Sequence, residues 1–147
     1  MDFVIRKFFS EDREEILTMM KEFYSSNAVS TNGSLEIFNN DFDNCVNSSP
    51  YLEGFVMCKE KEILGYAMIA KSFSTEFGKQ CVWLEDLYLK KDYRGHGIIP
   101  KFVSYIEEKY PNTILRLEVE EENTHAMHVY NKCGFEKLPY SELKKEL

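Results

Sequence analysis

The sequence lacks the features that mark several classes of protein. No stretch approaches the ~18 consecutive apolar residues of a membrane-spanning helix, so we expect a soluble protein with no membrane partner. The four cysteines, Cys45, Cys58, Cys81 and Cys133, have no CxxC spacing. This spacing argues against a zinc site and against a disulfide framework. We therefore expect reduced thiols, a cytoplasmic location and no bound metal.

Positive charge is also scarce. The chain has 18 Lys and Arg against 25 Asp and Glu, a net charge of -7. Because nucleic acids are bound by clustered Lys and Arg, we expect no nucleic-acid partner, and the acidic balance favours a cationic ligand. A hydrophobic fraction of 44% and a charged fraction of 29% are typical of a globular chain. With no repeat or linker, residues 1–147 are expected to form a single domain.

Apolar periodicity predicts the order of helices and strands. The predicted elements are a strand at 2–8, a helix capped by Ser10, a helix at 35–46, three strands between 54 and 89, a helix ending before Pro111, a strand at 113–119 and a helix stopped by Gly134. The tail after residue 139 has the composition of a helix but the position of a last sheet strand, and both remain open. This order predicts an α/β (α+β) domain with helices packed on a mixed sheet.

The segment "KKDYRGHGIIPKF" at 90–102 places two glycines between a strand and a helix. Such a loop exposes unpaired backbone N–H groups at the positive end of the helix, where an anion is stabilised. Without Cβ atoms at Gly95 and Gly97, a phosphate can approach the amides of residues 94–99. The glycines alone fit a plain strand-to-helix turn equally well. A dinucleotide or ATP loop is disfavoured, because Pro100 replaces the third glycine and no Gly-Lys-Ser/Thr is present.

Two motifs in the right order resemble those of the GNAT family of acetyl-CoA-dependent N-acetyltransferases. "DYRGHG" is similar to the family's Gln/Arg-x-x-Gly-x-Gly/Ala pyrophosphate motif, with Asp92 in place of the usual Gln or Arg. "NTHAMHVYNKCGF" resembles its Asn-x-x-Ala, Tyr and Gly-Phe pattern. Ile99 stands where the family often has Gly or Ala, and Pro100 follows. The resemblance is strong over roughly residues 80–138 and implies a mostly antiparallel central sheet flanked by about four helices.

The resemblance also implies the ligands. It implies acetyl-CoA as cosubstrate, a small-molecule amine as acceptor, no metal, and a homodimer as one compatible assembly. The residues that it places at the cofactor are Leu87, Tyr88, Leu89, Arg94, Gly95, His96, Gly97, Ile98, Ile99, Asn123 and Ala126.

Two side chains are the candidates for catalysis. Tyr130 resembles the family's tyrosine that protonates the CoA thiolate, and a phenol of ordinary pKa (about 10) keeps its proton at neutral pH. The alternative is that Tyr130 only packs in the core. In "WLEDLYL", Glu85 matches the acidic residue of the diamine (spermidine/spermine) acetyltransferases that draws the proton of the amine. We favour Glu85 over its neighbour Asp86 as the base, with a salt bridge as the alternative role.

The sequence thus predicts an N-acetyltransferase that acts on a primary amine, with a small cationic molecule favoured, by direct attack on the thioester. The departures at Asp92, Ile99 and Pro100 leave an alternative function open. In that alternative the chain is a non-catalytic acyl-CoA-binding or regulatory module.

Overall fold

The computed structural model describes residues 1–29 and 31–147. Five strands form one sheet in the order β1-β2-β3-β4-β5. The strands are β1 (Val4–Lys7), β2 (Leu52–Lys59), β3 (Glu62–Ser74), β4 (Lys79–Leu89) and β5 (Ile114–Leu117). The α-helices are α1 (Arg13–Tyr24), α2 (Leu35–Val46), α3 (Ile98–Lys109) and α4 (Thr124–Lys132), and short 3-10 helices cover Ser10–Asp12 and Lys91–Tyr93.

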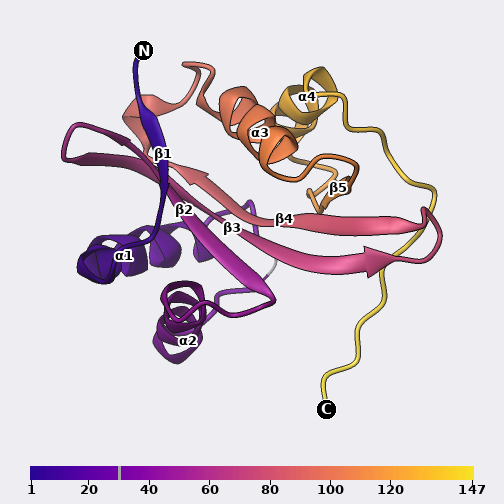
Figure 1. Cartoon of the computed structure of the whole chain (residues 1–147), viewed down its shortest axis with the longest axis horizontal. Coiled ribbons are helices and arrows are strands. Elements are labelled where there is room, and N and C mark those ends of the chain that lie inside the picture. The colour runs from indigo at the N-terminus through magenta and orange to yellow at the C-terminus, as the bar shows by residue number, and fades with distance from the viewer. Residues whose placement is uncertain (30) are drawn as a thin grey trace.

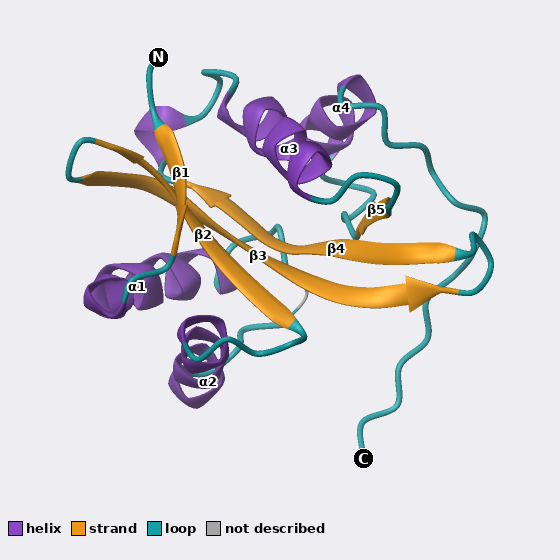
Figure 2. Cartoon of the chain, in the orientation of Figure 1, coloured by secondary structure: helices purple, strands orange, loops and turns teal. Residues whose placement is uncertain are grey.

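The sheet is mixed and mostly antiparallel, as predicted (Figure 2). Strands β1 to β4 pair antiparallel, whereas β5 runs parallel to β4 because α3 carries the chain back across the sheet between them. The predicted turn between β2 and β3 is confirmed, with Glu60 in the left-handed region at φ 57°.

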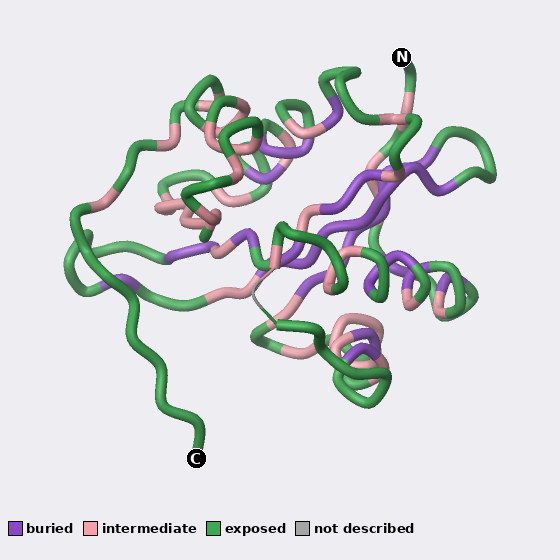
Figure 3. Tube along the Cα trace, turned by 180° about the vertical axis from the view of Figure 1, so that it is seen from behind, coloured by how far each residue is buried: buried purple, intermediate pink, exposed green. Residues whose placement is uncertain are grey.

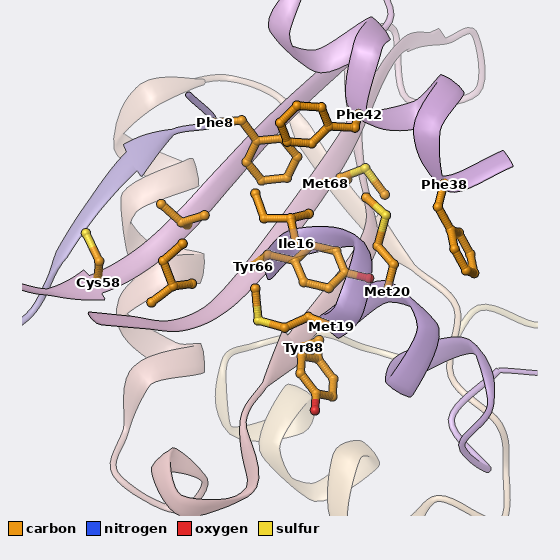
Figure 4. Packing of buried hydrophobic residues seen from close by; sticks show 12 residues of the cluster. Phe8, Ile16, Met19, Met20, Phe38, Phe42, Cys58, Tyr66, Met68 and Tyr88 are labelled. Atoms are coloured by element: carbon orange, nitrogen blue, oxygen red, sulfur yellow. The ribbon is translucent and has the colours of Figure 1, made fainter. Parts of the chain in front are cut away.

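Helices cover both faces of the sheet: α1 and α2 lie on one face, and α3 and α4 on the other (Figure 1). Alternation along the strands supplies each face with apolar side chains. The α1–α2 core includes Phe8, Ile16, Met20, Phe42 and Tyr66 (Figure 4). The α3 core includes Phe55, Ile69, Val82, Phe102 and Ile106. Because both faces of the sheet are covered, the residues of the central strands are buried over long stretches (Figure 3).

The helix boundaries confirm most of the sequence prediction. Helix α2 spans the predicted residues, and the Ser34 hydroxyl caps it by accepting a hydrogen bond from the Ile37 amide at 3.2 Å. The predicted cap at Ser10 is wrong, because Ser10 begins a 3-10 turn that precedes α1. The carboxylate of Asp12 instead accepts the Phe9 amide at 2.7 Å and pairs with Arg6 at 2.8 Å. Asp12 thus precedes α1, and its carboxylate holds the 3-10 turn without capping the helix.

The C-terminal tail adopts neither predicted alternative, so the expected final helix or strand is wrong. Within the described residues, no regular element follows α4, and Leu143 is 96% exposed. The tail is held by polar contacts: the Tyr140 hydroxyl donates to Glu76 at 2.6 Å, and Lys137 pairs with Glu121 at 3.3 Å. Without an apolar face to bury, the helix-favouring composition of this segment is not sufficient to form a helix.

Strand β4 is irregular around Glu85. Met68 of β3 pairs with Asp86 and Ile69 pairs with Leu84, so Glu85 is the extra residue of a β-bulge. Pairing with β5 ends at Leu84. Past that point, no described strand pairs with the outer edge of β4.

All four cysteines of the chain are free. None of the helices described combines the length and the apolar character that a bilayer crossing requires.

Candidate functional site

A groove of about 990 Å³ lies beside the bulge of β4. One wall comes from the end of α1 and the segment after it, and another comes from α4, β5 and the tail. Figure 1 shows the tail passing close to the turn where β3 ends and β4 begins. The groove residues used below are Tyr24, Glu85, Glu118, Tyr130, Cys133 and Glu142.

Glu85 occupies the bulge and points its carboxylate into the groove. The residue is exposed, yet desolvation by the groove walls raises its carboxyl pKa, and the nearby charges of Glu142 and Asp41 act in the same direction. A carboxylate with a raised pKa is a better proton acceptor than an ordinary one. The position and the electrostatics of Glu85 therefore suit a general base.

The neighbouring Asp86 has very different surroundings. It is 2% exposed and accepts hydrogen bonds from the hydroxyls of Tyr24 and Tyr66, each at 2.8 Å. Burial raises its pKa to about 6, and the two phenols oppose that shift. The two adjacent carboxylates are thus separated into one groove-lining group and one buried group.

Tyr130 also lines the groove, from the last turn of α4. Its ring meets Phe135 edge-on, with centroids 5.8 Å apart, because Gly134 turns the chain back at φ 96° and lets the Phe135 amide donate to the Tyr130 carbonyl. Burial first, and then the nearby Cys133, raise the pKa of the Tyr130 phenol to about 12. Its hydroxyl makes no hydrogen bond with any described residue. The phenol is therefore protonated at neutral pH and free to donate.

The glycine loop adopts the backbone that the sequence suggested. Gly95 and Gly97 have φ values of 81° and 75°, and an added Cβ at either would meet nothing within 4 Å. The glycines are therefore required by conformation and not by close packing. Among the described residues, the amides of Gly95, His96 and Gly97 donate to no backbone carbonyl. These amides stand at the N-terminus of the 12-residue helix α3, and Pro100 in its first turn removes no intrahelical bond.

The end of β4 presents its backbone and not its side chains. Tyr88 and Leu89 are 8% and 6% exposed, Leu87 packs on the α3 core, and the Tyr88 hydroxyl donates to Glu22. Arg94 folds back over this strand, with its Nε donating to the Leu89 carbonyl at 2.9 Å. What β4 can offer a ligand here is its open edge.

Asn123 and Ala126 are joined by a cap at the start of α4. The Asn123 side chain accepts a hydrogen bond from the Ala126 amide at 3.2 Å, which sets where α4 begins. Neither residue belongs to the described lining of the groove, and the glycine loop lies outside it as well. Glu85 and Tyr130 thus line the same groove, and the predicted cofactor residues are not among its described lining.

Sequence reasoning missed two acidic groove residues, Glu118 after β5 and Glu142 in the tail. Hydrogen bonding with the Glu142 carboxyl is the largest cause that raises the Glu118 pKa to about 7, followed by burial and by the charges of Glu142 and Glu85. The only sequence signal was the acidic net charge. No group of three or more metal-ligating side chains occurs among residues 1–29 and 31–147.

Comparison with known proteins identifies related sequences. Residues 14–135 match the model of the Acetyltransferase (GNAT) family. The chain is 35% identical over 83 residues to the thialysine N-epsilon-acetyltransferase of Bos taurus, which covers 54% of this chain and 48% of that protein. It is 26% identical over 83 residues to the probable spermine N(1)-acetyltransferase of Bacillus subtilis subsp. natto (strain BEST195), covering 52% and 55% respectively. The matches thus span about half the length of these curated relatives.

Solved structures share the fold. A possible acetyltransferase from Clostridium difficile 630 superposes with a TM-score of 0.82 at 19% identity, covering 99% of this chain and 97% of that one. The structure of AAC(6')-Iy in complex with the bisubstrate analog CoA-S-monomethyl-acetylneamine gives a TM-score of 0.80 at 14% identity, covering 100% and 99%. At such identities the likeness concerns the fold alone.

Proposed function

The chain belongs to the acetyltransferase (GNAT) family, and from this premise we propose that it transfers the acetyl group of acetyl-CoA to a primary amine. The proposal treats residues 1–147 as one catalytic domain. Its support comes from the loop, the open strand edge and the groove described above.

We assign the cosubstrate to the glycine loop and to the end of β4. The free amides of Gly95, His96 and Gly97 stand at the positive end of α3, and two or three such donors suit a pyrophosphate. The edge of β4 at residues 87–89 has no strand partner on its outer side, and apart from the Leu89 carbonyl, which Arg94 holds, it offers backbone groups to the amides of the pantetheine arm. A chain that pairs there would run along β4 toward Glu85.

The acceptor is proposed to be a small cationic amine. Glu85, Glu118 and Glu142 line the groove, and each of their carboxyl groups would be relieved of repulsion by an incoming ammonium. Both curated relatives described above are named for acting on amines, thialysine in one case and spermine in the other. The carboxylates of this chain provide an independent physical reason for the same preference.

The reaction assigns one task to each side chain. The ammonium of the acceptor loses a proton to Glu85, directly or through water, and the resulting amine nitrogen attacks the thioester carbonyl. The C–N bond forms and the C–S bond breaks, and Tyr130 gives its proton to the departing thiolate. The second proton of the amine nitrogen restores Tyr130, and the proton on Glu85 passes to solvent. The products are an N-acetyl amine, CoA and one released proton.

The observation that carries this proposal is that one groove is lined both by Glu85, whose carboxyl pKa is raised, and by Tyr130, whose phenol is protonated and not hydrogen-bonded within the described residues. The test is release of CoA thiol from acetyl-CoA with a panel of primary amines. In Tyr130→Phe we expect the rate to fall about 100-fold, the usual contribution of one general acid, with CoA affinity retained.

Tyr105→Phe is the matched control. Tyr105 is another partly buried tyrosine of the α3 face, it lies outside the groove, and it should keep the full rate. Thiol release that is unchanged in Tyr130→Phe would remove Tyr130 from the mechanism. Binding of acetyl-CoA with no turnover of any amine would favour the regulatory alternative.

A further inference from the structure

An arginine that takes no part in the mechanism above lines the same groove. Arg116 of β5 is half-buried, and its guanidinium lies over the ring of Trp83, 4.6 Å from the ring centroid. Trp83 belongs to β4 and is the residue that pairs with Arg116 in the parallel register of the two strands. The stack is therefore built from paired residues of neighbouring strands, which fix the place of the guanidinium.

This guanidinium has no counter-ion within the described residues. Several carboxylates line the groove, yet none of the ion pairs formed by the described residues includes Arg116. The arginine side chains that donate hydrogen bonds there are those of Arg6, Arg13 and Arg94. The N–H donors of a guanidinium lie in its plane, so stacking on a ring occupies its face and leaves the donors available. A carboxylate suits such a group, because it accepts two parallel hydrogen bonds from it.

The other cationic residues in the described lining of the groove differ from Arg116. Lys79 and Lys137 are exposed, and Lys137 pairs with Glu121 at 3.3 Å. An exposed ammonium on a flexible stem holds an anion weakly, because water competes and side-chain freedom is lost. Arg116 is therefore the cation of this lining that a neighbour holds in place and that still lacks a counter-ion among the described residues.

The distance between Arg116 and the proposed base follows from the strands. Glu85 lies two residues beyond Trp83 on β4, and Glu118 lies two residues beyond Arg116 in the same direction. Two residues of extended chain cover about 7 Å, which a short aliphatic chain can span. The groove thus has carboxylates near Glu85 and a guanidinium further along β4, toward the turn between β3 and β4.

We propose that Arg116, held on Trp83, is a subsite for a carboxylate of the acceptor, so that the preferred acceptor is an ω-amino acid. The inference rests on the proposed function, with the reacting amine at Glu85, and it concerns the end of the acceptor that does not react. Because the pantetheine arm is assigned to residues 87–89, the acceptor reaches Glu85 from the other direction along β4, past Arg116. Amines without a carboxylate still react, but they bind less tightly.

A pair of probes isolates the charge at the far end of the acceptor. These are 6-aminohexanoate and 6-aminohexanamide, which share the chain and the reacting amine and differ in whether the other end is charged. Their affinities for the CoA-saturated protein are measured by calorimetry, and their turnover is followed by thiol release. Arg116→Gln removes the guanidinium, and Lys137→Gln is the matched control because it removes another positive charge from the same lining.

We expect the wild type to bind 6-aminohexanoate about tenfold more tightly than the amide, as for one charge-assisted hydrogen-bonded pair. In Arg116→Gln the two affinities should agree within about twofold, whereas Lys137→Gln should keep the wild-type ratio. A second readout uses the wild type alone and does not depend on the folding of a variant. The preference for the carboxylate should weaken as the salt concentration rises, because ions screen a partly exposed ion pair.

Three results would overturn the inference: equal affinities of the wild type for both probes, the same loss of preference in both variants, or a preference that salt leaves unchanged. The second would mean that the net charge of the groove, and not Arg116, selects the carboxylate. A preference that depends on Arg116 but comes without turnover of either probe would refute the proposed function and leave the subsite standing. Turnover of both probes with equal affinities would refute the subsite and leave the proposed function standing.

Discussion

Replacing Gly97 by alanine tests the glycine loop in isolation. An added Cβ meets nothing within 4 Å, so the cost arises from the φ of 75° and not from a collision. An L-residue in this left-handed region loses about 1 kcal/mol, which lowers the Tm by about 2–4 °C for a chain of this size. Relief of that strain rotates the peptide planes on either side of residue 97 and turns their amides away from a bound anion. One amide hydrogen bond to a charged group contributes about 1.5–3 kcal/mol, so CoA affinity should fall at least about tenfold.

Gly78 provides the matched control. It lies in the turn between β3 and β4 with a φ of 66°, and its Cβ would also meet nothing within 4 Å. Gly78→Ala should therefore lose the same stability as Gly97→Ala, while its CoA affinity stays that of the wild type. Thermal unfolding and calorimetric titration with CoA measure both quantities. Equal CoA affinities in the two variants would refute the assignment of the pyrophosphate to this loop.

Three further predictions concern other parts of the molecule. Burial raises the Asp86 pKa from 3.8 to about 6, so the native state binds this proton more tightly than the unfolded chain. As the pH falls from 7 to 4, the free energy of unfolding of the wild type should therefore rise relative to that of Asp86→Asn. The expected gain is up to roughly 3 kcal/mol, measured by urea unfolding. Gly65→Ala should lose more than about 3 kcal/mol in the same assay, because its Cβ would lie 2.2 Å from the Tyr88 carbonyl oxygen, and a loss under about 1 kcal/mol would contradict this packing of β3 on β4. Glu142→Gln should lower the Glu118 pKa from about 7 in an NMR titration, since the Glu142 carboxyl is the main cause of its elevation, and an unchanged value would place the tail away from the groove.

Local patterns predicted the elements well because each element is specified by its own residues. Helix α2 begins after its Ser34 cap and α4 ends before Gly134, and both signals are short in range. The sequence predictions were wrong at two places, the start of α1 and the C-terminal tail, where local sequence preference did not decide the structure. Ser10 begins a 3-10 turn and does not cap α1, and the helix-favouring tail has no apolar face to bury.

The candidate site divides in the same way. The glycine loop and Tyr130 could be found because they belong to motifs, and the resemblance of the Leu-Glu-Asp strand singled out Glu85 over Asp86. The bulge that separates these two carboxylates depends on the register between β3 and β4, which no single segment reveals. The contact of Tyr24 with Asp86 joins residues 62 positions apart, and no local pattern predicts it.

The central claim is that this groove passes an acetyl group to an amine nitrogen. The most direct test is to incubate the protein with acetyl-CoA labelled with carbon-13 in the acetyl group, together with cadaverine, and to follow the label by NMR. The account predicts that the label moves from the thioester to an amide of cadaverine, and that Tyr130→Phe greatly slows this transfer. A label that stays in the thioester while the protein demonstrably binds acetyl-CoA, with cadaverine and with every other primary amine tried, would contradict it.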